Sequence, residues 1–363
     1  FLELDNNKNN GTNNMTFEFG ICGTFDFEEN YTGGQSIKTR EFYLALKDSV
    51  ANDNIKIVES TSWKENPIYF IISLISLFRN YNKIIISVAQ NGIRILIPFC
   101  SLLNLLFRRN LYYLSIGGWL PRFTKRRKWL ASFLKMFDKI FVETKVMKTA
   151  LEAQGFKNIE ILENFKLIEP LNESEVKFVD SKEFQICFFS RIMREKGIED
   201  AIQVVEKINK NSNYSKCFLD IYGPISSEYE NNFHKLIDSS SKAIRYCGKV
   251  HPSESVKILK KYDIQLFPTH YFTEGIPGSI IDSFFAAVPV IASRWASFEE
   301  VIDDGLDGIG YKFMDNEDFY LKLNWLINNS ELINQMKKNC LKKASRYRAE
   351  NIIHNFLKIT SVN

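Results

Sequence analysis

Residues 268–293 read PTHYFTEGIPGSIIDSFFAAVPVIAS. A short apolar run, 264–267, comes just before them, and the fixed φ of Pro277 suits the first turn of a helix. A second apolar run, 288–292, follows that helix. The order strand, loop, helix, strand is the repeating unit of a parallel α/β sheet, so this stretch predicts a parallel sheet covered by helices.

The same alternation of strand-like and helical patterns continues in both directions along the chain. At 363 residues the chain is too long for one ordinary core and suits two α/β domains. We therefore predict two Rossmann-like, doubly wound parallel-sheet domains. The expected strands are 17–25, 55–59, 83–88, 111–116, 139–143 and 159–162 in the first domain, and 184–190, 217–222, 244–246, 264–267 and 288–292 in the second.

The polar and acidic run 166–183, which contains Pro170, is the expected linker between the two domains. It separates a first domain, 15–165, from a second, 184–350. Residues 1–14 hold six Asn and no Met. We expect this segment to be a disordered leader or a remnant that takes no part in the fold.

The composition excludes several classes of protein. Hydrophobic residues make up 45% of the chain and charged residues 25%, and a net charge of +4 is too small to indicate a nucleic-acid partner. The six cysteines form no C-x-x-C pair, and with four histidines they predict no metal site and a reducing cytoplasm. The apolar runs 69–78 and 93–107 are shorter than the roughly 18 residues that span a membrane, so we expect buried or interfacial helices and no integral membrane protein.

Two cations follow the strand expected at 184–190. In FFSRIMREKGIEDAI, residues 188–202, Arg191 and Lys196 precede a helix. Arg offers a bidentate fork, Lys a point charge, and a helix N-terminus attracts anions, so the pair can neutralise a diphosphate. After the first strand, Gly33 and Gly34 either let the backbone approach a ligand closely or form a tight turn.

Loops at the carboxyl ends of parallel strands are where open α/β sheets bind ligands. Glu274 lies in such a loop, and Asp282 lies eight residues later on the helix that Pro277 opens. Two carboxylates at this spacing can bind different hydroxyl pairs of one elongated ligand. The backbone between them would face phosphates, and it comprises Gly275, Ile276, Pro277 and Gly278.

These segments resemble the retaining, GT-B-fold glycosyltransferases of family four (the group 1 type), here of the bacterial surface-polysaccharide kind. The family shows S-R-x-x-x-x-K-G and E-G-[FIL]-P-x-x-x-x-E segments. Ser190-Arg191 with Lys196-Gly197, and Glu274-Gly275-Ile276-Pro277, match both in order and spacing. The resemblance is strong over 184–308 and rests mainly on the Gly33-Gly34 loop in the first domain. It implies two domains facing across a cleft, with the donor in the second and 351–363 forming a helix that returns to the first.

The resemblance also implies roles for single residues. Arg191 and Lys196 would hold the donor diphosphate, and Glu274 would hydrogen-bond the sugar hydroxyls. Asp282 would bind the ribose, and the loop 247–250, with Gly248, would lie near the base. Transfer would proceed with retention and without a metal or cofactor, because the two cations stabilise the departing diphosphate.

Two departures from the family pattern concern the donor site. Asp282 stands where the family has Glu, and no histidine occurs in the first domain, where many members place one near the donor. Gly118, in the run 115–119, is a candidate for facing the donor sugar, with a plain turn as the alternative. His270 is a candidate for facing the cleft, with a satisfied loop histidine as the alternative.

The basic segment 122–137 mixes cations with Trp129, Phe133 and Phe137, a pattern that can rest on anionic lipid. The alternative is that the aromatic rings face the core and the cations face water. We predict a UDP- or GDP-sugar donor, a lipid-linked or oligosaccharide acceptor, no nucleic acid, and a cytoplasmic place that includes the inner face of the membrane. Two other functions stay open, a non-catalytic subunit that binds nucleotide sugar or glycan and a sugar-nucleotide epimerase of the same fold.

Overall fold

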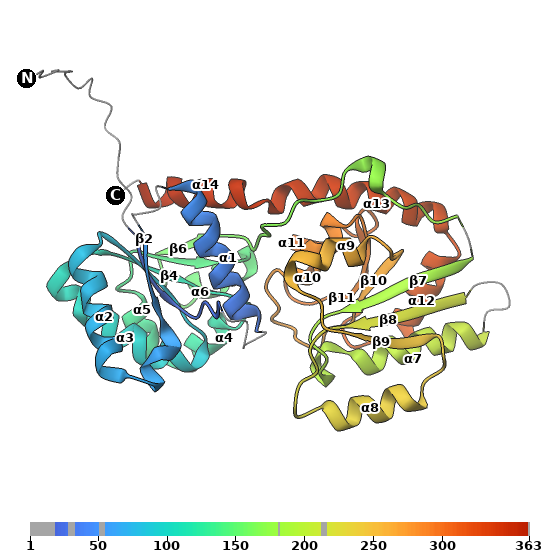
Figure 1. Ribbon diagram of the computed structural model, residues 1–363, viewed down its shortest axis with the longest axis horizontal. Helices are drawn as coiled ribbons and strands as arrows, with labels where there is room; N and C mark the ends of the chain where they lie inside the picture. The colour runs from blue at the N-terminus through green and yellow to red at the C-terminus, as the bar shows by residue number, and fades with distance from the viewer. Residues whose placement is uncertain (1–18, 28–32, 51–54, 181, 212–215, 362–363) are drawn as a thin grey trace, which may run out of the picture.

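The computed structural model describes residues 19–27, 33–50, 55–180, 182–211 and 216–361. In this part of the chain, two parallel sheets of six strands lie in two lobes (Figure 1). The prediction of two doubly wound parallel-sheet domains is therefore confirmed. The leader expected at 1–14 lies outside the described residues.

The first sheet has the strand order β2-β1-β3-β4-β5-β6, and all neighbouring strands are parallel. Helices cover both of its faces, so its central strands are apolar on both sides; Ile84, Ile85 and Ile86 are all fully buried. The strands are β1 (Phe19–Gly23), β2 (Ile55–Glu59), β3 (Lys83–Ser87), β4 (Asn110–Leu114), β5 (Lys139–Val142) and β6 (Ile159–Ile161). The helices are α1 (Gly34–Ser49), α2 (Pro67–Asn80), α3 (Gln90–Phe107), α4 (Leu120–Lys125), α5 (Lys128–Leu134) and α6 (Lys145–Glu152).

The second sheet has the order β12-β11-β10-β7-β8-β9 and is also parallel throughout. Its α10 begins at Gly278 with Pro277 as the N-cap, one residue after the expected start. The strands are β7 (Glu183–Phe189), β8 (Lys216–Tyr222), β9 (Ile244–Gly248), β10 (Ile264–Phe267), β11 (Val290–Ser293) and β12 (Gly308–Tyr311). The helices are α7 (Ile198–Asn211), α8 (Glu230–Ser239), α9 (Ser255–Leu259), α10 (Gly278–Phe285), α11 (Phe298–Val301), α12 (Asn316–Ile327) and α13 (Ser330–Ala344).

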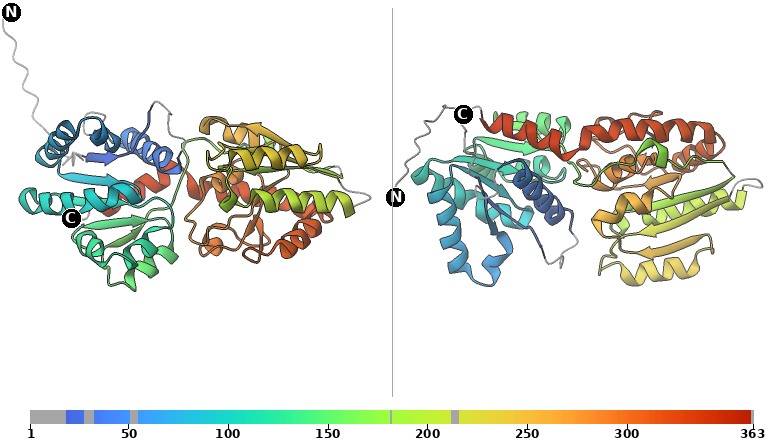
Figure 2. Two further views of the ribbon diagram at one scale, coloured as in Figure 1. Left: turned by 90° about the horizontal axis from the view of Figure 1, so that it is seen from below. Right: turned by 45° about the horizontal axis from the view of Figure 1, so that its top comes forward.

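The chain passes between the lobes twice, and the two passages lie side by side. After β6 it runs forward to β7, and after Tyr347 it returns, with Lys166 and Arg348 forming a parallel bridge and the Lys166 N–H donating to Tyr347 O at 3.2 Å. The returning helix α14 (Ala349–Ser361) packs on the first lobe beside α1. The right-hand view of Figure 2 shows α13 and α14 along the same side of both lobes. The C-terminal helix thus fastens the second lobe to the first.

Phe356 anchors α14 to the first lobe. It is fully buried, and its ring centroid lies 5.0 Å from those of both Phe42 on α1 and Phe141 on β5. Such aromatic contacts add to the free energy gained by burying the rings.

One helix extends beyond the apolar run that predicted it. The helix expected from the run 93–107 begins three residues earlier, at Gln90, so α3 has 18 residues and is long and apolar enough to cross a membrane by length and composition. Yet α3 lies in the helix layer, with Ile93, Ile97 and Cys100 buried among residues that face the sheet. Its opposite face is exposed, so α3 is neither wholly buried nor unpartnered.

Replacing Phe356 with Ala should lower the free energy of unfolding by about 3–5 kcal/mol, because it leaves a cavity between α14, α1 and the sheet. Urea denaturation followed by circular dichroism measures this loss. His354→Ala, an exposed position on the same helix, is the control and should change stability by less than about 0.5 kcal/mol. Equal effects of the two substitutions would contradict the anchoring role of Phe356.

Candidate active site

The loop between β10 and α10 reaches across to the first lobe, where glycines let the two backbones approach closely. A Cβ at Gly118 would lie 1.8 Å from Thr273 O, and a Cβ at Gly275 would lie 1.9 Å from Glu143 Oε2. Neither position has room for a side chain. Gly118 therefore belongs to the contact between the lobes, beside Glu274.

Glu143, the residue after β5, ties this loop to the first lobe. Its Oε2 accepts the Ile276 N–H at 2.7 Å, and its Oε1 accepts the Gly117 N–H at 2.9 Å. Lys38 of α1 pairs with the same carboxylate at 2.5 Å. On the other side of the peptide, Ile276 O accepts the side-chain N–H of Asn164 at 2.8 Å. One carboxylate thus fixes the position of the Glu-Gly-Ile-Pro segment.

The structure brings Glu274 and Lys196 together. Their side chains form an ion pair, and Thr269 donates its hydroxyl to Glu274 Oε1 at 3.1 Å. Both side chains are largely shielded, with 18% of Lys196 and 16% of Glu274 exposed. Gly197 makes this possible, because its φ is +73° and a Cβ there would lie 1.9 Å from Pro268 O.

Arg191 lies opposite the glycine loop of the first lobe. A Cβ at Gly33 would lie 3.7 Å from Arg191 Nη2, while one at Gly34 would meet nothing within 4 Å. Gly33 is the N-cap of α1 and has φ −84°, so its backbone conformation does not require glycine. The N-terminus of α1 and the Arg191 guanidinium therefore face the same space, which suits an anion.

Asp282 has a different environment from the one its predicted role suggests. It is 4% exposed, and its Oδ2 lies 3.2 Å from Lys166 Nζ, which comes from the crossing between the lobes. Glu41 of α1 lies 4.0 Å from the same ammonium group. The contact of Asp282 with a ribose stays a prediction, and in this structure Lys166 is its partner.

Burial shifts the protonation of this triad. It raises the pKa of Asp282, and Lys166 only partly opposes the rise. It also raises the pKa of Glu41. Burial alone would lower the pKa of Lys166, but the charges of Asp282 and Glu41 outweigh burial and raise it. The lysine therefore stays charged while each carboxylate resists ionisation.

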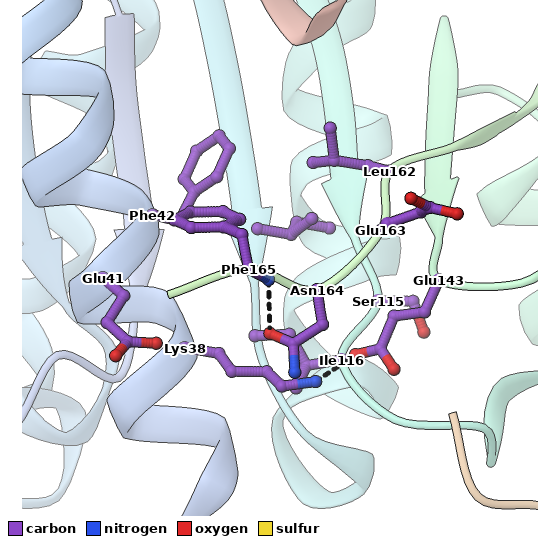
Figure 3. Close-up of a pocket in the computed structure, with 11 residues that line it drawn as sticks. Lys38, Glu41, Phe42, Ser115, Ile116, Glu143, Leu162, Glu163, Asn164 and Phe165 are labelled. Carbon is purple, nitrogen blue, oxygen red and sulfur yellow. Dashed lines mark hydrogen bonds and ion pairs between the residues drawn. The ribbon is translucent and has the colours of Figure 1, made fainter. Parts of the chain in front are cut away.

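A small pocket of about 30 Å³ opens beside this contact, at the carboxyl edge of the first sheet (Figure 3). Its charged lining residues are Lys38, Glu41, Glu143 and Glu163, and Figure 3 shows the Lys38 ammonium turned toward Glu143. Ser115 and Asn164 add neutral polar groups. Charged and neutral polar groups of the first lobe thus share one small pocket beside the contact between the lobes.

His270 and Gly248 lie outside this cluster of contacts. The His270 ring bonds Asp200 of α7, with 2.6 Å between Nε2 and Oδ2, and the side chain is 24% exposed. This pairing matches the alternative of a satisfied loop histidine. Gly248 ends β9 with φ +87°, and a Cβ there would meet nothing within 4 Å. The backbone after β9 is therefore open to a ligand such as a base.

Six residues of this contact were missed from the sequence: Lys38, Glu41, Glu143, Asn164, Lys166 and Thr269. Glu143 and Asn164 each lie just past a strand of the first sheet, and a polar residue at the carboxyl end of a buried strand is a usable signal. Lys38 and Lys166 carry no such signal, because their roles depend on how the lobes meet.

The basic segment 122–137 forms two short helices, α4 and α5, and not a single one. Its aromatic rings divide between the two expected environments. Phe123 and Phe137 are buried, whereas Trp129 is 49% exposed. Within the described ranges, no three His, Cys, Asp or Glu side chains are grouped so that they could hold a metal ion.

Comparisons with known proteins bear on the second lobe and on the fold. Residues 171–343 match the family model of the glycosyl transferases group 1, which places the family segment on the second lobe. An uncharacterized 41.2 kDa protein in a cps region of Klebsiella pneumoniae is 25% identical over 219 residues, 59% of this chain and 54% of that protein. An uncharacterized glycosyltransferase of Methanocaldococcus jannaschii is 26% identical over 167 residues, 46% of this chain and 42% of that protein. The chain thus matches about half the length of these curated relatives.

Solved structures with the same fold cover nearly the whole chain. Anabaena HepE in complex with UDP has a TM-score of 0.75 at 12% identity and covers 96% of this chain and 100% of its own. A sucrose-phosphate synthase from Thermosynechococcus elongatus has a TM-score of 0.72 at 12% identity and covers 95% and 98%. The fold is GT-B, and residues 171–343 of its second lobe resemble the glycosyl transferases group 1.

Lys166→Met should lower the free energy of unfolding at pH 7 by about 3–5 kcal/mol, because it leaves two buried carboxylates without their cation. The double variant Lys166→Met/Asp282→Asn should recover most of that loss. Urea denaturation of the single and double variants gives the coupling energy. Lys157→Met, at an exposed position, is the control. Additive effects of the two substitutions would contradict the pairing of Lys166 with Asp282.

Glu41→Gln tests the raised pKa of Glu41 through the pH dependence of stability. A carboxylate with a raised pKa in the folded state binds its proton more tightly there than in the unfolded chain. Its contribution to stability is therefore present at low pH and lost as the pH rises through and above its ordinary value of 4.5. Compared with the natural protein, Glu41→Gln should therefore gain stability as the pH rises above the ordinary glutamate pKa of 4.5. A difference that does not change with pH would show that Glu41 titrates normally.

Proposed function

We propose that this protein transfers a sugar, with retention and without a bound metal, from a UDP- or GDP-sugar to a lipid-linked or oligosaccharide acceptor. The observation that carries the proposal is the contact between Lys196 and Glu274, two residues 78 positions apart in the sequence. In this proposal Lys196 binds the donor diphosphate and Glu274, beside it, binds the sugar. Arg191, facing Gly33, adds a second cation on the cleft side.

The chemistry asked of these residues is electrostatic. When the bond between the anomeric carbon and the diphosphate breaks, negative charge grows on the leaving phosphate oxygens. Arg191 and Lys196 would stabilise that charge, in a cleft where few waters screen it. Glu274 already accepts from Lys196 and Thr269, so a sugar hydroxyl would bind a carboxylate whose position is fixed. Front-side attack by the acceptor would then give retention, as the family resemblance implies.

The donor class draws support from the structural neighbours. HepE has been solved with UDP, with UDP and glucose, and with UDP-glucose. We therefore put UDP-sugars before GDP-sugars as donors. The Klebsiella relative is named for its cps region, which suits a role in surface-polysaccharide biosynthesis. A lipid-linked acceptor would also fit a peripheral contact of residues 122–137 with the inner, cytoplasmic face of an anionic membrane.

The donor proposal is tested by thermal shift with UDP, GDP and their sugars, with and without EDTA. A nucleotide at about a hundred times its Kd should add about 2.7 kcal/mol of stability, and EDTA should not change the shift. Arg191→Ala and Lys196→Ala should each weaken nucleotide affinity by about tenfold or more, since each removes a cation from the diphosphate. Arg194→Ala is the matched control, because Arg194 lies in the same loop and its side chain is 76% exposed. Equal losses in all three variants would contradict the assignment.

Turnover is tested by Glu274→Gln, which keeps the size of the side chain and removes its charge. We expect donor binding to persist and sugar transfer to fall by about a hundredfold or more. Transfer at the natural rate would remove Glu274 from the site. A natural protein that binds UDP-sugar and transfers to no acceptor would favour the non-catalytic subunit.

A further inference from the structure

The first lobe carries an exposed apolar surface that the transfer site does not use. On α2, Ile68, Tyr69 and Ile72 are 72%, 64% and 60% exposed. On α3, Leu105 and Leu106 are 60% and 79% exposed. Among the described residues, these two helices carry nine of the 22 exposed large hydrophobic side chains, and the others of the nine are Ile71, Ile75, Ile95 and Leu102.

These side chains share one face of the molecule. Helices α2, α3 and α5 are neighbours in one layer, and each buries its inner side in the same core on one face of the first sheet. Figure 1 shows them together on the outer side of the first lobe, away from the second lobe. Their outward sides therefore form one surface, which Trp129 of α5 and Met136 extend at 49% and 42% exposure. We call this the α2–α3–α5 surface.

The charge of the segment that builds this surface has one sign. Residues 66–137 contain 11 Lys and Arg and no Asp or Glu. Most of these cations are exposed, among them Arg79 at the end of α2, Arg94 on α3 and Arg108 just after it. Others lie on α4 and α5, such as Lys125 and Lys128. The segment that builds this surface thus combines exposed apolar side chains with exposed cations.

This combination fits an anionic lipid bilayer. Exposed apolar patches of this extent mark binding surfaces. Leu, Ile and Trp side chains enter the boundary between head groups and acyl chains, while Lys and Arg pair with anionic head groups. The inner sides of α2 and α3 are committed to the core, so neither helix can cross the bilayer without leaving the sheet. We infer that the first lobe docks on an anionic membrane through the α2–α3–α5 surface, lying on the bilayer and not spanning it.

The docking surface also leads to the transfer site. Helix α4 begins two residues after Gly118, which touches the Thr273–Glu274 backbone, and α4 packs against α5. The basic run between α4 and α5 therefore connects the bilayer with the cleft. A lipid-linked acceptor, which belongs to the proposed function, would reach the site by that route. The docking itself rests on the exposed side chains and their charges.

The experiment is flotation of the full chain with phosphatidylcholine vesicles, with and without about 30% phosphatidylglycerol. The natural protein should float with the anionic vesicles, and less at high salt. Leu102→Asp and Leu321→Asp form a matched pair, because Leu102 is 54% exposed on α3 and Leu321 is 53% exposed on α12 of the second lobe. Leu102→Asp should lower vesicle partition by about tenfold or more, and Leu321→Asp should leave it unchanged.

Three further variants separate the contributions. Ile72→Asp on α2 should repeat the loss seen with Leu102→Asp, so a folding defect in one variant does not decide the result. Lys128→Glu should weaken binding to anionic vesicles only, and Lys242→Glu, exposed on the second lobe, is its control. Thermal shift with UDP on the same samples reports on the donor site. Loss of the UDP shift alone would refute the donor proposal and leave the docking proposal intact.

Two results would overturn the docking proposal. One is a natural protein that does not float with anionic vesicles while it still binds UDP. The other is self-association of the lipid-free protein that Leu102→Asp abolishes, with no vesicle binding, because the surface would then be an interface between copies of the chain.

Discussion

The arrangement of the candidate site depends on one carboxylate. Glu143 accepts N–H groups from Gly117 of its own lobe and from Ile276 of the other, and it pairs with Lys38 of α1. A buried carboxylate is stable only when its lone pairs are used, and three donors meet that need here. Because the Ile276 N–H is one of the three, the loop that carries Glu274 is fixed against the first lobe. The same close approach of the two lobes explains why positions 118 and 275 are glycine, because neither position has room for a Cβ.

The fold was predictable from the sequence because it rests on local patterns. Apolar runs that end in glycine or proline loops predict parallel strands, and most strands appear within one or two residues of the expected bounds. The contact between Lys196 and Glu274 was also within reach, since both lie at carboxyl ends of neighbouring strands of one sheet. Glu143, Lys38 and Lys166 were not predicted as site residues. Glu143 and Lys166 contact Ile276 and Asp282 of the second lobe, and Lys38 pairs with Glu143 from 105 positions away in the first. No periodicity within one chain segment encodes such distant contacts.

Asp282 shows that a sequence motif can predict a residue at a position without predicting what surrounds it in the fold. The motif places a carboxylate at this position of α10, and the fold then buries it against Lys166. Lys166 lies on the crossing segment, bridged to Arg348 where the chain returns. A movement of the lobes about these two passages would therefore act on the Lys166–Asp282 contact directly. A ribose hydroxyl that binds Asp282, as proposed, would have to share the carboxylate with the ammonium group or replace it, which would couple donor binding to the lobe contact.

The first lobe keeps its exposed cations apart from the acidic groups that lie near the second lobe. Residues 66–137 hold Lys and Arg but no Asp or Glu, so their exposed cations create a local positive field on this lobe. The acidic groups of the first lobe that serve the lobe contact, Glu41 and Glu143, lie outside that segment and are shielded from water. One lobe thus separates its two kinds of charge by position. The buried carboxylates fix the loop that carries Glu274, and the exposed cations remain available to bind the proposed anionic membrane.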